Sequence, residues 1–152
     1  MEALAAAADQ AVKAAERSGD HVILHLGLGF RGWANGRLGH HAAACNDMDQ
    51  SNAVGTGLGP LILADWFAVG RADIALSAGH IDEALMLAAQ AVEAAEQVDS
   101  VFTAGLAHRV WAQALAAATP PRWDEAEAHL TICLRELESG DARLPAAHAR
   151  LF

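Results

Sequence analysis

Positive charge and several residue types are scarce in this sequence of 152 residues, which has no tyrosine, one lysine, two cysteines and four prolines. Ten lysine and arginine residues stand against nineteen aspartate and glutamate residues, so the net charge is −9. Binding to nucleic acids or to anionic membranes depends on clustered positive charge. We therefore expect neither kind of partner for this segment.

Long apolar runs and cysteine patterns are also lacking. No stretch reaches the ~18 apolar residues of a membrane-spanning helix, and the N-terminus lacks the regions of a signal peptide. Cys45 and Cys133 show no spacing typical of a disulfide or metal framework. Both are predicted to be reduced, small core residues, and the protein is expected to be cytoplasmic.

Alanine, by contrast, is abundant, with 37 residues. It is the strongest helix former and lets helices approach closely, whereas the valine and isoleucine runs typical of strands are few. The composition predicts an all-α fold, and the length fits one domain with a sizeable core.

Several short segments recur at a step of about 40 residues, or at twice that step. QAVKAAE at 10–16 returns as QAVEAAE at 90–96, Asp9 as Asp49, Arg31 as Arg71, and LGH at 38–40 as AGH at 78–80. A third copy follows after an insertion of two residues near Pro121. A two-helix period of this size is typical of a solenoid.

Apolar periodicity and the glycine and proline breaks predict an antiparallel helix-hairpin solenoid of about seven helices. The expected helices span 2–18, 21–38, 41–53, 61–78, 81–98, 101–118 and 124–138, and a further helix starts at Asp141. Residues 22–26 have strand propensity and precede three glycines. Their register opposite 61–78 nevertheless favours a helix, because buried glycine lets neighbouring helices touch.

Small residues recur within each unit, first in one helix and then 12 to 14 and about 20 positions later in the next. They are Gly32, Ala44 and Ser51; Ala72, Ala84 and Ala91; Ala112, Ala126 and Cys133. This spacing resembles that of tetratricopeptide (TPR) repeats, whose helices cross tightly at such positions. The resemblance implies a right-handed superhelix. The period is longer than the 34 residues of that family, and Ala68, Ala75 and Ala88 stand where it favours aromatic residues.

Residues 101–151 also resemble the long TPR-like repeats at the C-terminal end of large bacterial signalling proteins. Those proteins join an ATPase module to a nucleotide cyclase or to a LuxR-type DNA-binding domain. The resemblance implies a non-enzymatic interaction or regulatory scaffold without a cofactor, related to or excised from a signalling or transcriptional regulator. Its partner would be a protein, a peptide or another domain of a longer chain.

One domain is expected over residues 1–152, with units at 21–58, 59–99 and 100–140 and partial repeats at 1–20 and 141–152. Both ends of such an array leave an apolar helix face uncovered, whereas solenoids normally end in polar capping repeats. We therefore expect either a piece of a longer polypeptide or a homo-oligomer joined through the uncapped ends.

In TPR repeats the first helices line a concave groove. Transferred by register, its lining positions are Leu26, Gly29, Trp33 and Arg37; Trp66, Val69, Asp73 and Ser77; Leu106, Arg109, Gln113 and Ala117. Tryptophan and arginine are typical interface anchors. The predicted partner-binding set is Trp33, Arg37, Trp66, Asp73, Arg109 and Gln113. Two alternatives stay open: the tryptophans belong to the core, with Asp73 and Arg109 solvated, or the groove encloses a small ligand.

Patterns that could carry chemistry are weak. GLGFRG at 27–32 is a G-x-G-x-x-G motif with Asp47 and Asp49 downstream, which keeps a dinucleotide-binding enzyme as a third alternative. No strand pattern follows to build its parallel sheet. His21 with His25, and His41 with Cys45, have the i, i+4 spacing of metal ligands but lack partners. We therefore predict no catalytic residue and no metal site.

Overall fold

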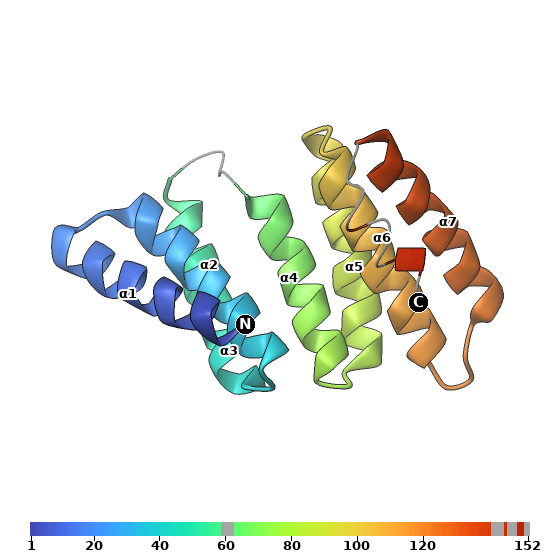
Figure 1. The fold of residues 1–152 in the computed structure, drawn as a ribbon, viewed down its shortest axis with the longest axis horizontal. Coiled ribbons are helices and arrows are strands. Elements are labelled where there is room, and N and C mark those ends of the chain that lie inside the picture. The colour runs from blue at the N-terminus through green and yellow to red at the C-terminus, as the bar shows by residue number, and fades with distance from the viewer. Residues whose placement is uncertain (59–62, 141–144, 146–148, 151–152) are drawn as a thin grey trace.

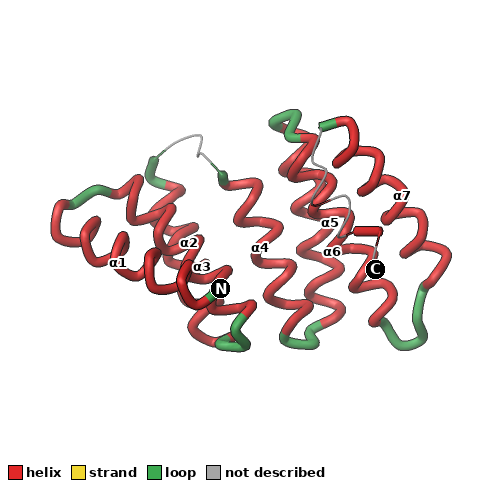
Figure 2. Tube along the Cα trace, in the orientation of Figure 1, coloured by secondary structure: helices red, strands yellow, loops and turns green. Residues whose placement is uncertain are grey.

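The computed structural model describes residues 1–58, 63–140, 145 and 149–150, and this part of the chain is built from seven α-helices without a strand (Figures 1 and 2). The helices are α1 (Glu2–Ser18), α2 (His21–Arg37), α3 (His41–Thr56), α4 (Ala64–Ser77), α5 (Ile81–Gln97), α6 (Val101–Ala117) and α7 (Trp123–Ser139). The all-α prediction is confirmed. The start of the expected fourth helix at 61 and most of the helix expected from Asp141 lie outside the described residues.

Most predicted boundaries agree with the structure within one or two residues. The largest difference is at α3, which continues three residues beyond the expected end and includes Gly55. Backbone hydrogen bonding continues there because Gly57, which follows the helix, keeps a helical φ of −81°. At α2 the competing strand propensity of residues 22–26 is overruled, because the side chain of Asp20 accepts a hydrogen bond from the Ile23 amide at 3.0 Å and starts a helix.

A left-handed residue at the end of a helix recurs at positions separated by multiples of 20. These residues are Gly19, Gly39, Gly79 and Asp99, with φ of 72°, 82°, 79° and 51°. After each one, the next amide donates to the carbonyl five residues earlier, as in a Schellman motif. A helix of 17 residues, as in α1, α2, α5 and α6, plus a turn of three explains the 40-residue period of a hairpin.

Consecutive helices pack against each other in an antiparallel array, as predicted for a helix-hairpin solenoid (Figure 1). Helices α2, α4 and α6 also contact one another and form a continuous inner layer. Helix α4 packs closely on α5 but only loosely on α3. The inner layer therefore carries most of the contact between α1–α3 and α4–α7.

The small residues of the repeat lie where the helices cross. The exposure of Ala44, Ala72, Ala84, Ala91 and Ala112 is 0%. Gly32 shows why size matters here, because a Cβ at this position would lie 3.0 Å from the carbonyl oxygen of Ala44. The predicted small positions are therefore those at which the hairpins close.

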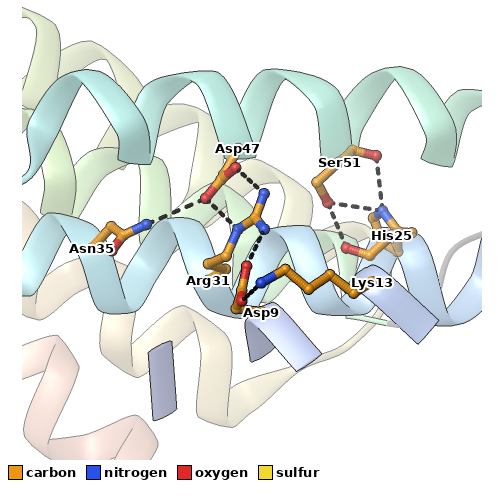
Figure 3. A network of polar contacts seen from close by, with 7 residues as sticks. All are labelled: Asp9, Lys13, His25, Arg31, Asn35, Asp47 and Ser51. Atoms are coloured by element: carbon orange, nitrogen blue, oxygen red, sulfur yellow. Dashed lines mark hydrogen bonds and ion pairs between the residues drawn. The ribbon is translucent and has the colours of Figure 1, made fainter. Parts of the chain in front are cut away.

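A repeated ion pair joins neighbouring units. Arg31 of α2 reaches Asp9 of α1 at 3.0 Å, and 40 residues later Arg71 of α4 reaches Asp49 of α3 at 3.1 Å. In the first copy Arg31 also binds the buried Asp47 through both guanidinium edges, at 2.7 and 2.9 Å (Figure 3). These carboxylates raise the pKa of Arg31 above its usual value, Asp47 most strongly. The sequence step of 40 is thus a step in space.

One prediction about the core is wrong. Cys133 is buried, but Cys45 is exposed. Ala44, Asp47 and Met48 are the α3 residues that turn inward at this level, and Cys45 faces a cleft between α3 and α5 instead. Within the described ranges, none of the helices is both long and apolar enough to cross a membrane.

Candidate binding groove

One open cavity of about 610 Å³ runs across the inner layer, and we call it the groove. Helices α2, α4 and α6 supply most of its lining, with contributions from the start of α1 and from Pro145. The lining residues are Met1, Leu4, Phe30, Trp33, Ala34, Arg37, Trp66, Asp73, Leu106, Arg109, Gln113 and Pro145. All six residues of the predicted partner-binding set are among them.

The 40-residue period explains why these side chains meet. Trp33, Asp73 and Gln113 are 40 residues apart and occupy equivalent places on α2, α4 and α6. The inner helices pack side by side, so equivalent places become neighbours. The indole Nε1 of Trp33 accordingly donates a hydrogen bond to Asp73 Oδ2 at 3.1 Å.

Asp73 is the polar centre of the groove. Its side chain is 4% exposed, and one of its oxygens accepts from Arg37 Nη1 at 3.3 Å. Arg109 Nη2 lies 3.8 Å from the other oxygen. A buried carboxylate needs such partners, because removing a charge from water costs several kcal/mol, order of magnitude. The expectation that Asp73 and Arg109 are solvated is therefore wrong for Asp73.

Aromatic rings form one wall of the groove. Trp33 and Trp66 meet edge to face with centroids 6.2 Å apart, and Trp66 lies 5.5 Å from Phe102 of α6. Trp33 is half-buried and also packs on two core clusters, one with Val69 and Ala72 and one with Met48 and Phe67. The alternative of a core or a groove tryptophan therefore resolves to both roles for Trp33.

Several residues expected in the groove lie elsewhere. Gly29 and Val69 are buried between helices, where Gly29 makes room for the ring of Phe67. Leu26, Ser77 and Ala117 are also absent from the groove lining. The sequence analysis missed Phe30 and Leu4. Phe30 could have been found, because it precedes Trp33 by three residues and shares its helix face.

The G-x-G-x-x-G motif lies inside a helix. Residues 27–32 fall in the middle of α2, where their amide groups belong to the helical hydrogen-bond ladder. Phosphate binding by this motif needs free amides at the start of a helix. All three glycines are buried against neighbouring helices instead. The geometry that the dinucleotide alternative requires is therefore not present at this motif.

The histidine pairs do not build a metal site in the described residues, which contain no cluster of three metal-ligating side chains. His25 Nδ1 donates to the carbonyl of Ser51 at 2.9 Å, and the Ser51 hydroxyl donates to the His25 carbonyl (Figure 3). His41 Nε2 lies 3.2 Å from the Ser77 hydroxyl. The spacing of these residues serves contacts between helices.

A different histidine pair, missed in the sequence, joins α6 to α7. His108 Nδ1 and His129 Nδ1 are 2.8 Å apart, and Trp111 stacks on His129 with centroids 4.1 Å apart. Burial and the nearby His129 lower the pKa of His108 to about 4. Burial also lowers the pKa of His129. These residues are 21 positions apart, and no local sequence pattern marks them as partners.

Compared with known protein-family models and with curated protein sequences, the chain matches none. The assignment of a role to the groove therefore depends on its geometry.

Proposed function

We propose that this chain is a non-enzymatic scaffold that binds a segment of a partner protein in the groove. The observation that carries the proposal is the convergence of Trp33, Trp66 and Arg109 from three helices on one open cavity. Large aromatic and arginine side chains clustered in a central, partly desolvated patch are the usual source of binding energy at interfaces. The inner layer also crosses three hairpins, which suits an extended segment.

The resemblance to TPR repeats supports the same function, because such repeats bind partner segments along their first helices. We further propose that the chain is a relative or a part of a bacterial signalling or transcriptional regulator, in which the groove receives another domain or a partner. Shifts between hairpins would relay occupancy of the groove. This relay requires that amide exchange changes on binding.

A second candidate is a sensor of a small ligand. The specific observation in its favour is the size of the groove, about 610 Å³, which falls within the range of small-molecule pockets. Its few convergent polar groups beside aromatic walls are also typical of such sites. The two candidates share a site and differ in the size of the occupant.

The test is selection of peptides from a random display library on the purified chain, followed by affinity measurements on Trp66→Ala. We expect the selected peptides to bind at least about ten-fold more weakly to this variant, because interface tryptophans typically contribute 2 kcal/mol or more. Trp123→Ala is the matched control, since Trp123 is 64% exposed and lies outside the groove.

Circular dichroism on both variants separates loss of binding from loss of folding. The proposal fails if no peptide is enriched, or if a folded Trp66→Ala variant binds the selected peptides as well as the parent chain does. A metabolite panel in a thermal-shift assay tests the second candidate in parallel, and a stabilising metabolite without any peptide ligand would favour the sensor.

A further inference from the structure

The groove carries more positive than negative charge. Its charged side chains are Arg37, Asp73 and Arg109, so two guanidinium groups face one carboxylate. The rest of the chain has the opposite balance, with a net charge of −9 overall. Elsewhere the partly buried arginines have carboxylates of their own, as Arg31 has Asp47 and Arg71 has Asp49. The groove is thus a local cationic site on an acidic protein.

The guanidinium of Arg109 has hydrogen-bonding capacity left over. Its side chain is 19% exposed, and within the described part of the chain its one hydrogen bond runs from Nη1 to Gln113 Oε1 at 2.9 Å. The 3.8 Å distance to Asp73 is an ion-pair contact beyond hydrogen-bond length. An arginine offers five N–H donors in a planar fork that fits a carboxylate. Most of the Arg109 donors remain available to an occupant of the groove.

The second guanidinium is placed to assist. Arg37 is 49% exposed and contacts the other oxygen of Asp73, at 3.3 Å. Asp73 therefore holds Arg37 on one side and Arg109 on the other. Gln113 fixes Arg109 from α6 itself, since the two residues are four positions apart. This arrangement orients two cations before a ligand arrives, which lowers the cost of binding an anion.

Apolar surface adjoins these cations. Trp66, Phe30 and Leu106 line the same cavity, so an anion bound by the arginines lies beside a wall suited to a large apolar side chain. We propose that the groove recognises an acidic peptide segment, with a carboxylate side chain on Arg37 and Arg109 and a neighbouring aromatic or aliphatic side chain on Trp66. The peptide part of this inference rests on the proposed function above; the preference for an anion rests on the charges of the groove.

The test uses pools of acetylated and amidated hexapeptides, in which side chains alone carry charge. One position is fixed as Glu, Gln or Lys, its neighbour is fixed as Leu, and the rest are mixed. Binding of fluorescent pools to the full chain is followed by anisotropy. We expect the Glu pool to bind roughly ten-fold more tightly than the Gln pool, because charge-assisted hydrogen bonds are about twice as strong as neutral ones. The Lys pool is expected to bind most weakly.

Variants assign the preference to named residues. Arg37→Gln and Arg109→Gln should each reduce the advantage of the Glu pool over the Gln pool, whereas Arg135→Gln, an exposed arginine of α7, should leave it unchanged. Asp73→Asn keeps an acceptor for Trp33 and removes the competing negative charge. We expect it to bind the Glu pool more tightly than the parent chain does. A purely structural role of Asp73 would give the opposite result.

Two controls keep the outcomes separate. Equal binding of the Glu and Gln pools, or preference for the Lys pool, would overturn the acidic-peptide inference and leave a peptide-binding groove in place. If no pool binds but 3-phenylpropionate quenches tryptophan fluorescence more than its amide does, the anion site stands, and both the peptide ligand and the scaffold function fail. If none of these probes binds, both proposals fail. Because Arg109→Gln affects a largely buried group, the half-exposed Arg37→Gln decides the case if the former does not fold.

Discussion

The turns between helices depend on single left-handed residues. At 19, 39 and 79 this residue is glycine, which adopts positive φ without steric cost. At 99 it is Asp, with φ of 51°, although the hydrogen bond from the Ser100 amide to the Ala95 carbonyl is the same as at the glycine turns. A non-glycine residue in this region carries strain of about 1 kcal/mol or more. One equivalent position of the repeat therefore holds strain that the others avoid.

We predict that Asp99→Gly increases the free energy of unfolding by about 1 kcal/mol, because it removes this strain. Gly79→Ala should decrease it by about 1–2 kcal/mol. A Cβ at Gly79 has nothing within 4 Å, so the second effect measures backbone conformation alone. Urea denaturation of both variants provides the values. A stabilised Gly79→Ala variant would show that residue 79 is not left-handed in solution.

Between elements, the contact of α6 with α7 depends on the protonation of two imidazoles. His108 and His129 approach through their Nδ1 atoms at 2.8 Å, so one nitrogen donates and the other accepts. This arrangement requires that neither nitrogen pair carries two protons. Burial, followed by the charge of His129, lowers the pKa of His108 from 6.5 to about 4, while Glu136 opposes and Arg135 assists the shift. On the other side, Glu125 raises and Arg122 lowers the pKa of His129. Glu96 and Asp99, at the end of α5, line the same cavity as His108.

We predict that the free energy of unfolding falls as the pH decreases from about 6.5 to about 4. In this window the unfolded chain binds a proton that folded His108 does not, so acid favours unfolding. Above pH 6.5 the contribution is fully present. His108→Phe should flatten this part of the pH profile in urea denaturation, and the exposed His80→Gln should not. A profile for His108→Phe as steep as that of the parent chain would contradict the assignment.

At the scale of the whole molecule, α1–α3 and α4–α7 are joined mainly through the inner layer. Helix α3 contacts α4 loosely, and a cleft of about 350 Å³ opens between α3 and α5. The junction of α2 with α4 is correspondingly tight. A Cβ placed on Gly29 would lie 2.3–2.5 Å from ring atoms of Phe67. The same junction positions Trp33 of α2 against Trp66 and Asp73 of α4, so the groove depends on it.

We predict that Gly29→Ala destabilises the protein by about 1–3 kcal/mol through overpacking, despite the higher helix propensity of alanine. Gly57→Ala is the control, because a Cβ there first meets the Val54 carbonyl at 3.5 Å and the backbone φ is −81°. It should be neutral or stabilise by up to about 1 kcal/mol. Thermal and urea unfolding compare the two. Equal stability of both variants would show that α2 and α4 are further apart than the structure places them.

The repeat made much of the fold predictable. Helix ends follow from local chemistry, such as the cap at Asp20 and the left-handed Gly39 and Gly79, so the sequence predicts them directly. The 40-residue step also predicts that Trp33 and Asp73 lie near each other, and they share a hydrogen bond. Positions such as Gly29, Val69 and Cys45 were misplaced, because a shift of one residue turns a helical side chain by about 100°, and sequence alone does not fix the direction of the neighbouring helix.

The sequence by itself determined the helices, their turns, the small residues at which hairpins close and the set of side chains that share the groove. These features depend on contacts within about 20 residues or on a period that repeats them. Only the tertiary structure decided that Asp73 is buried between two arginines, that His108 meets His129, and that α3 stands apart from α5. The reason is physical: burial and pKa depend on which side chains distant helices bring together and how closely, and helix propensity contains no information about that distance.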